Sequence, residues 1–284
     1  MFYDLKKDIE YSKAILEMND VGISNFLGIS RMSLSRWQNN IVTPSPETLD
    51  KIYDKLYDAG VNLNRLKEEM YKSSMSDGHE VLFHGAKTEL IGNPSIDFSE
   101  GKKDFGRGFY LGETFNQSAS FVTTYKDSSI YVFDFDKSNV NIVEFNVSRD
   151  WMILIAYFRE KLEDYKDSNY LKELLEKINK VDVVIAPIAD NTMYTTLDDF
   201  IQGKITDLQC LNALSANRLG KQYVFLNNEV INSNLKMLDR CYFSINEKKD
   251  YQNYRLKENK IGKNKVKLAL REYAGKGKYI EELL

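Results

Sequence analysis

The residues best suited to chemistry lie in one short stretch of the chain. A His-Gly pair, His84-Gly85, ends a short apolar run, and a Gly-x-Gly-x-Tyr motif with Gly108 and Tyr110 follows about two dozen residues later. A glycine lets backbone amides come close to a ligand, and an aromatic face can stack on a planar cation. The order of these residues is therefore the first guide to function.

Further polar and aromatic residues follow the same motif. Ser118 and Phe121 lie on a predicted short helix, and Gln222 lies in the strand-like run KQYVF. Two carboxylates are also candidates for chemistry, because Asp104 precedes the glycines and Asp190 ends the apolar run VVIAPIAD. Either could act as a base for an acceptor or as an electrostatic partner, and the sequence does not choose between them.

The order and spacing of these residues resemble the NAD-binding core of ADP-ribosyltransferases, especially the poly(ADP-ribose) polymerase and diphtheria-toxin branch. The resemblance implies that His84 binds a ribose hydroxyl of NAD and that the Gly85 backbone binds the carboxamide. It also implies that Ser118 bonds the carboxamide, and that Tyr110 and Phe121 stack on the nicotinamide ring. The reaction breaks the bond between nicotinamide and ribose through an oxocarbenium-like transition state, which a site must stabilise electrostatically.

The chain departs from that branch on the late strand, where the family has a glutamate and this chain has Gln222. A neutral glutamine can bond the ribose hydroxyl but carries no charge to offset the developing cation. The resemblance therefore implies mono-ADP-ribosyl transfer with NAD as the substrate. The chain has only two histidines, so we expect no metal site built on histidine. The resemblance implies catalytic roles for His84, Tyr110 and Gln222, and it adds Gly108 to the NAD-binding residues. Asp104 is added to the catalytic candidates as a carboxylate that could compensate for the missing glutamate.

A closer resemblance is to a bacterial family of unknown function with the signatures HG, DFGxGFY, an Ala-Asp pair and QYVF. Here these read HGA, KDFGRGFY, APIADN and KQYVF, over about residues 81–230. The resemblance implies that glutamine at position 222 is normal for the family. It also implies a toxin of a toxin–antitoxin or phage-defence system with a small antitoxin partner.

The N-terminal part of the chain follows the pattern of a Cro/C1-type helix-turn-helix. Gly28 is predicted to make the turn, and Ser30 is predicted to cap a helix with Met32, Leu34 and Trp37 facing inward. Residues 24–40 would then contact DNA, with Arg31, Ser33, Arg36, Gln38 and Asn39 as candidate contacts. A role in dimerisation or partner docking stays open beside DNA binding.

The texture of the sequence changes from helical to strand-rich near residue 80, which indicates an α+β fold. We expect a small all-α helix-turn-helix domain over 1–75, then a mixed two-sheet ADP-ribosyltransferase-like domain over 80–240, and a basic helical extension over 241–284. The chain has two cysteines and a net charge of −3, which exclude a disulfide framework and a general attraction to nucleic acid. With no apolar run long enough to span a membrane, the sequence predicts a cytoplasmic protein without membrane contact.

Three functions are compatible with this reading. The first is an NAD-dependent mono-ADP-ribosyltransferase that modifies DNA, RNA or protein. The second is a transcriptional regulator whose degenerate transferase domain only senses NAD or ADP-ribose. The third is an NAD glycohydrolase, which would release nicotinamide without labelling an acceptor.

Overall fold

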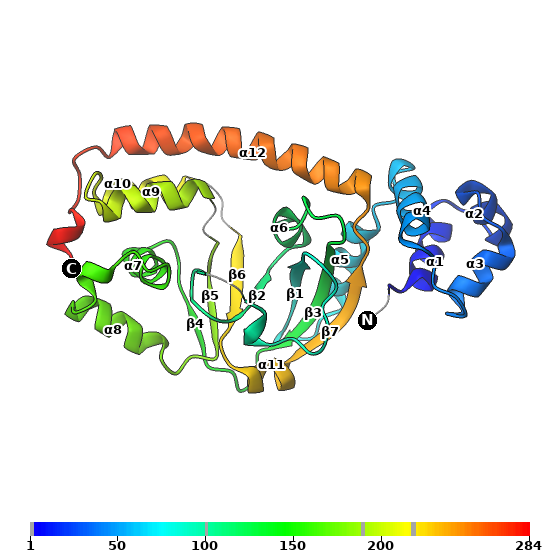
Figure 1. Cartoon of the computed structure of the whole chain (residues 1–284), viewed down its shortest axis with the longest axis horizontal. Coiled ribbons are helices and arrows are strands. Elements are labelled where there is room, and N and C mark those ends of the chain that lie inside the picture. Colours follow the sequence, from blue (N-terminus) through cyan, green and yellow to red (C-terminus); the bar gives the residue numbers. More distant parts are fainter. Residues whose placement is uncertain (1–2, 100–101, 189–190, 217–219) are drawn as a thin grey trace. The chain divides into compact units, whose positions relative to one another are not determined.

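The computed structural model describes residues 3–99, 102–188, 191–216 and 220–284. Its fold class is α+β, as predicted: N-terminal helices come first, a mixed sheet with helices follows, and a long helix lies near the C-terminus (Figure 1). Across the described residues, none of the helices combines the length and apolar character that a membrane span requires.

The strands of the described residues form one mixed sheet, in the order β4-β5-β6-β2-β1-β3-β7. The prediction of two sheets is therefore wrong, because period-2 patterns identify strands but not which strands pair. Strand β4 runs parallel to β5, whereas β6 runs antiparallel to both β5 and β2. The strands are β1 (His79–Ala86), β2 (Phe109–Gly112), β3 (Ser129–Asp136), β4 (Ile142–Glu144), β5 (Val183–Pro187), β6 (Lys221–Phe225) and β7 (Leu235–Cys241).

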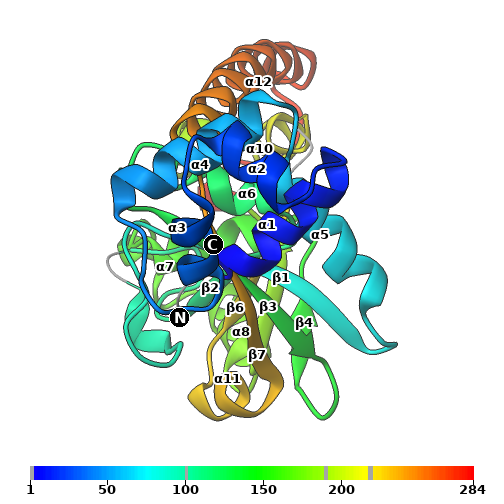
Figure 2. The same cartoon turned by 90° about the vertical axis from the view of Figure 1, so that its right-hand side faces the viewer.

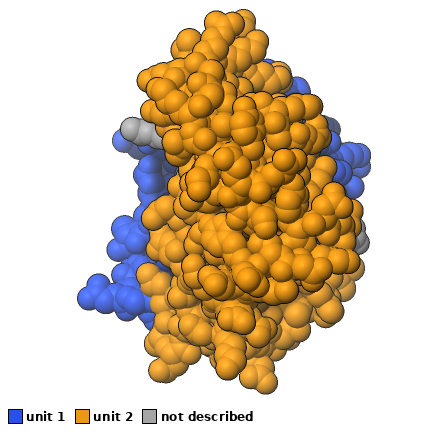
Figure 3. Space-filling model, turned by 90° about the vertical axis from the view of Figure 1, so that its left-hand side faces the viewer, with its two compact units in different colours: residues 1–89, 114–135, 237–254 blue, residues 90–113, 136–236, 255–284 orange. Residues whose placement is uncertain are grey.

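The chain divides into two compact units, which Figure 3 colours separately. Unit 1 comprises residues 1–89, 114–135 and 237–254, and unit 2 comprises the remaining residues, 90–113, 136–236 and 255–284. Unit 1 therefore contains the N-terminal helices together with β1 and most of β3 and β7. Unit 2 contains β2, β4, β5 and β6 and the helices packed on them. The domains predicted at 1–75, 80–240 and 241–284 stay a prediction.

The N-terminal helices of unit 1 form as their local sequence signals predict. Gly28 ends α2 in the left-handed region at φ 72°, and the Ser30 hydroxyl caps α3 by accepting from the Ser33 backbone. Leu34 is buried as expected, but Met32 is 71% exposed, so its predicted inward orientation is wrong. The helices are α1 (Leu5–Ile15), α2 (Asp20–Leu27), α3 (Arg31–Gln38), α4 (Pro46–Asp58) and α5 (Leu63–Ser74).

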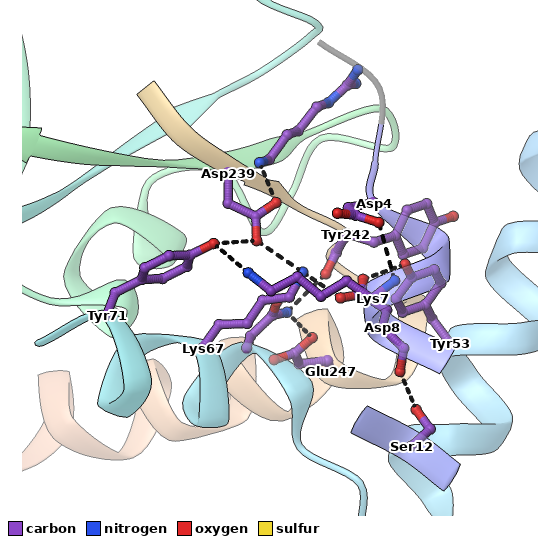
Figure 4. A network of polar contacts seen from close by, with 12 residues as sticks. Asp4, Lys7, Asp8, Ser12, Tyr53, Lys67, Tyr71, Asp239, Tyr242 and Glu247 are labelled. Carbon is purple, nitrogen blue, oxygen red and sulfur yellow. Dashed lines mark hydrogen bonds and ion pairs between the residues drawn. The ribbon is translucent and has the colours of Figure 1, made fainter. Parts of the chain in front are cut away.

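A buried polar network ties these helices to β7 within unit 1 (Figure 4). The Lys67 ammonium lies 2.5 Å from Asp8 Oδ1 and 3.2 Å from Asp239 Oδ2. Tyr53 donates to Asp8 and Tyr71 donates to Asp239. Burial alone would lower the pKa of Lys67, but the two carboxylates outweigh burial and raise it. Helices α1, α4 and α5 are therefore tied to β7 by charges that are costly to separate.

Unit 2 is organised around an apolar helix, α7 (Arg149–Phe158), whose residues 151–156 are all buried. A turn and a short 3₁₀ segment separate α7 from the next helix, α8 (Asn169–Ile178). A helix that is apolar on nearly every side must be buried in a core rather than lie on a surface. Unit 2 also contains α9 (Asn191–Ile201), α10 (Asp207–Ser215) and α11 (Asn228–Asn234).

The C-terminal part of the chain contains a strand and a long helix. The sequence predicted a basic helical extension over 241–284. The chain first completes strand β7 at Cys241, and α12 (Ile245–Glu272) begins after it. Figures 1 and 2 show α12 as the long orange helix. The remaining elements are α6 (Phe115–Ser120) and the 3₁₀ helices η1 (Ile96–Phe98), η2 (Glu163–Tyr165) and η3 (Ile280–Glu282).

Candidate functional site

A buried carboxylate, Asp104, is the centre of a polar group in unit 2. Arg159 donates to Asp104 Oδ1 from Nε at 2.9 Å and from a terminal nitrogen at 2.7 Å. The Tyr194 hydroxyl donates to the same oxygen at 3.0 Å, and Gln222 Nε2 donates to Asp104 Oδ2 at 2.9 Å. Only 5% of Asp104 is exposed, so this carboxylate depends on these four donors in place of water.

Four separate elements supply the members of this group. Asp104 lies in the loop before β2, Arg159 is the C-cap of α7, Tyr194 lies in α9 and Gln222 lies in β6. The pairing of β6 with β2 and β5 sets Gln222 opposite Gly112 on one side and Ala186 on the other. Gln222 is therefore fixed by the sheet, and the loops and helices bring the other three residues to it.

The hydrogen bonds of Gln222 define what its side chain can do. Its Nε2 donates to Asp104 and also, at 3.1 Å, to the carbonyl of Pro187. A primary amide has two N–H donors and one carbonyl oxygen, so both donors are used by the protein. The group that Gln222 can offer a ligand is its oxygen, an acceptor. This is the hydrogen-bonding function that the resemblance assigns to the residue at this position.

Arg159 and Tyr194 are functional candidates that the sequence did not identify. The Arg159 guanidinium pairs with Asp104 and lies 3.6 Å from the centre of the Tyr194 ring. The Tyr194 hydroxyl also accepts a hydrogen bond from Arg159. An arginine at a helix end and a tyrosine inside a helix belong to no motif, so neither carried a sequence signal. Their contacts show that Asp104 is balanced by a positive charge.

Tyr110 is held by its hydroxyl rather than free in a cleft. The hydroxyl donates to the Gly106 carbonyl at 2.7 Å and accepts from the Phe105 backbone at 3.2 Å. Burial raises the pKa of Tyr110, so the phenol stays protonated at neutral pH. The aromatic ring is thus fixed against the loop that carries Asp104.

Both glycines of the Gly-x-Gly motif have structural reasons to be glycine. Gly106 has φ +70°, a conformation that side chains other than glycine rarely adopt. A Cβ on Gly108 would lie 2.8 Å from Val224 and 2.9 Å from the Phe225 carbonyl, because β2 packs closely against β6. The motif is therefore required for the fold of unit 2, whether or not it also binds a ligand.

In unit 1 the structure brings Gly85 and Ser118 together. A Cβ on Gly85 would lie 2.5 Å from the Ser118 carbonyl oxygen, closer than real Cβ contacts, so the site requires glycine. The Ser118 hydroxyl donates to the Phe83 carbonyl at 2.7 Å. Ser118 is buried, and its hydroxyl proton is used by the protein, which leaves its oxygen as the group that could bond a ligand.

The other two predicted residues of unit 1 flank this contact. His84 is partly buried in β1, next to Gly85. Phe121 is the C-cap of α6 and is 51% exposed, so it is not a core aromatic residue. A large aromatic side chain exposed at a helix end is available to stack on a planar ligand.

The predicted residues divide between the units. His84, Gly85, Ser118 and Phe121 belong to unit 1, whereas Asp104, Gly108, Tyr110 and Gln222 belong to unit 2. Asp190 lies outside the described residues. Within the described part of the chain, no group of three or more His, Cys, Asp and Glu side chains is arranged to hold a metal ion. Cys210 and Cys241 are buried free thiols.

The predicted DNA-contact helix, α3, is exposed along much of its surface. Arg31, Arg36 and Asn39 are exposed, and Gln38 is partly exposed. Ser33 is partly buried, and its hydroxyl bonds that of Ser30 at 2.9 Å, as part of the helix cap. The arginines are thus free to reach a partner, whereas Ser33 mainly stabilises the start of the helix.

Comparison with known proteins gives a family match over more than half of the chain. The model of a family described as "Protein of unknown function (DUF3990)" matches residues 81–237. That range includes every residue predicted for the NAD site, and it begins three residues before His84. No curated protein and no solved structure matches the chain.

Proposed function

The chain belongs to the DUF3990 family, and we propose that it is an NAD-dependent mono-ADP-ribosyltransferase that acts on a macromolecule. The observation that carries the proposal is the contact between Gln222 and Asp104, 118 residues apart in the sequence. Gln222 stands where the resembling enzymes have their glutamate. Asp104 supplies the carboxylate that Gln222 lacks, at a distance of 2.9 Å.

The chemistry assigns separate tasks to the two residues. In the reaction, the bond between nicotinamide and ribose breaks, and its electron pair leaves with nicotinamide. The acceptor atom then bonds the ribose carbon and loses a proton. Gln222 Oε1 accepts a ribose hydroxyl, and the Asp104 carboxylate polarises the Gln222 amide through their hydrogen bond, because linked hydrogen bonds strengthen one another. Arg159 keeps Asp104 in position and limits the local negative charge.

The roles of the remaining residues come from the resemblance. His84 orients the ribose, and Gly85 and Ser118 bind the carboxamide. Tyr110 and Phe121 stack on the nicotinamide ring, and Gly108 belongs to the same NAD-binding motif. The proposal extends to an ADP-ribosyltransferase-like domain over residues 80–240, a cytoplasmic location, and a toxin controlled by a small antitoxin in a toxin–antitoxin or phage-defence system.

The proposal is tested by incubating the full-length protein with radiolabelled NAD and a cell lysate. We expect label on a macromolecule, which nuclease or protease treatment then assigns to nucleic acid or protein. His84→Ala, Gln222→Ala and Asp104→Asn should each abolish labelling, while the surface variant Lys172→Ala should retain it. If the folded wild-type protein neither labels an acceptor nor releases nicotinamide, the transferase proposal is wrong. Nicotinamide release without label would identify a glycohydrolase.

A second candidate function is a transcriptional regulator with a domain that senses NAD or ADP-ribose. The exposure of Arg31 and Arg36 on α3 favours it, because such side chains can contact bases and phosphates through residues 24–40. Specific binding to a DNA operator, altered by NAD and without nicotinamide release, would select this function over the first.

A further inference from the structure

The second half of α12 carries a row of basic side chains on one face. Lys260, Lys263, Lys267 and Arg271 are separated by three or four residues, which sets them on the same side of a helix. All four are exposed. These four residues are called the basic row below. Among the described residues, no carboxylate lies within ion-pair distance of any of the four, whereas many lysines elsewhere in the chain are paired.

The rest of unit 2 holds this helix in place from the other side. Gly262 and Val266, on the face of α12 away from the basic row, are buried. Gln209 of α10 donates to the Leu270 carbonyl at 3.0 Å. Two further hydrogen bonds lie beyond the C-terminal end of the helix. The Asp207 backbone N–H donates to the Lys278 carbonyl at 2.8 Å, and the Lys278 backbone N–H donates to the Asp207 carboxylate at 2.7 Å. The basic row is therefore displayed by an anchored helix.

The charge of the chain is strongly divided. Residues 255–284 contain nine Lys and Arg against four Asp and Glu, an excess of five positive charges. The other 254 residues contain 39 − 9 = 30 basic and 42 − 4 = 38 acidic residues, an excess of eight negative charges. The helix-turn-helix segment over 1–72 has ten basic and eleven acidic residues and shares no such excess. The excess of positive charge that a polyanion-binding surface needs therefore lies in the segment that contains the second half of α12.

We propose that the basic row binds the phosphodiester backbone of a nucleic acid. At 1.5 Å per residue, positions 260–271 cover about 16 Å, the length over which one strand of a duplex presents about five phosphates. Exposed Leu256, Ile261 and Leu268 are interrupted by lysines and asparagine, so α12 lacks the continuous apolar face that a membrane-surface helix needs. The proposed contact is between the basic side chains and the phosphate groups, which DNA and RNA share.

This inference names nucleic acid as the acceptor class, and in that respect it rests on the proposed function. The binding itself does not require the transferase activity. It can therefore be measured without NAD, and the two claims can fail separately.

The test is fluorescence anisotropy of the full-length protein with labelled single-stranded DNA, single-stranded RNA and duplex DNA of 20 nucleotides, over a salt series. The triple variant Lys260→Ala/Lys263→Ala/Lys267→Ala removes three charges from the basic row. The triple variant Lys166→Ala/Lys172→Ala/Lys180→Ala removes the same charge from another exposed part of unit 2. Circular dichroism melts check that both variants fold.

We expect the basic-row variant to bind at least tenfold more weakly at 50 mM salt, with the control within twofold of wild type. The slope of log K against log salt should fall by about two to three, since each phosphate contact contributes about 0.7 to 0.9. The three probes distinguish DNA from RNA. Vesicles of 30% phosphatidylserine are tested beside the nucleic acids. The proposal is overturned if the wild type binds none of the three nucleic acids, if the two triple variants bind them equally well, or if the wild type binds only the vesicles.

The labelling experiment separates the two claims. Binding through the basic row, with no labelling by NAD, would leave the surface in place and reject the transferase. Nucleic-acid binding together with label only on protein would reject nucleic acid as the acceptor.

Discussion

The amide of Gln222 donates a 2.9 Å hydrogen bond to the carboxylate of Asp104, so that two residues far apart in the sequence form one polar group. The sequence singled out both residues separately: Gln222 as the neutral residue in place of a glutamate, and Asp104, beside Asp190, as a carboxylate that could compensate for it. Their hydrogen bond shows that the two side chains belong to the same polar group. It also gives a physical reason for glutamine at position 222, since a glutamate there would oppose the charge of Asp104.

Gln222→Glu should destabilise the protein by about 3 kcal/mol. A carboxylate cannot donate to Asp104 or to the Pro187 carbonyl, and two carboxylates would lie in contact in a buried place. Unfolding in urea measures the loss. The double variant Asp104→Asn/Gln222→Glu restores a donor and an acceptor with reversed polarity, and it should recover part of the stability. Equal stability of Gln222→Glu and wild type would contradict the observed orientation of the amide.

Arg159→Met should cost about 2–4 kcal/mol, because it leaves the buried Asp104 carboxylate without its charged partner. The nearby Lys161 pairs with Asp198 at 3.2 Å, but these side chains are 48% and 36% exposed. Lys161→Met therefore serves as a control with a loss of less than about 1 kcal/mol. Similar losses in the two variants, measured by chemical unfolding, would mean that Asp104 does not depend on Arg159.

Gly85→Ala should lower stability by about 1–3 kcal/mol, because the added Cβ meets the Ser118 carbonyl oxygen and forces β1 and α6 apart. Ser118→Ala removes only the bond to the Phe83 carbonyl and should cost about 1 kcal/mol. Thermal melting of both variants tests whether Gly85→Ala lowers the melting temperature more than Ser118→Ala does. An unchanged melting temperature for Gly85→Ala would show that the two elements are not in close contact.

The stability of unit 1 should depend on pH through Glu247. Burial raises the pKa of Glu247 to about 8, although Asn64 donates to its carboxylate at 2.7 Å. In the unfolded chain the group titrates near 4.5, so over this interval the folded state holds a proton that the unfolded state releases. The stabilisation is complete below the unfolded pKa and is lost as the pH rises through the folded pKa.

We therefore expect the melting temperature of the wild type to fall between pH 5.5 and 8.5 more steeply than that of Glu247→Gln, which cannot titrate. Glu258→Gln, at an exposed position of α12, should keep the wild-type slope. Parallel pH profiles for wild type and Glu247→Gln would exclude Glu247 as the titrating group.

Local sequence signals were sufficient to predict where helices begin and end in much of the N-terminal segment. Gly28 at the end of α2 and Ser30 at the start of α3 both act where the sequence predicted them, because capping and turn geometry depend on neighbouring residues only. Met32 was misjudged, since helical spacing alone does not say which apolar residue faces the core. The strand β7 was missed because its run of mixed charged and apolar residues has no clear period.

The candidate site shows even more clearly that local sequence signals do not predict which distant segments come into contact. The sequence by itself determined the α+β class, the N-terminal helical segment and the identity of the motif residues, because these depend on composition, spacing and local propensity. Only the tertiary structure decided that Asp104 meets Gln222, that Arg159 and Tyr194 complete the group, and that Gly85 touches Ser118. Such contacts depend on strand pairing and helix packing between distant segments, and a linear pattern carries no record of which segments will meet.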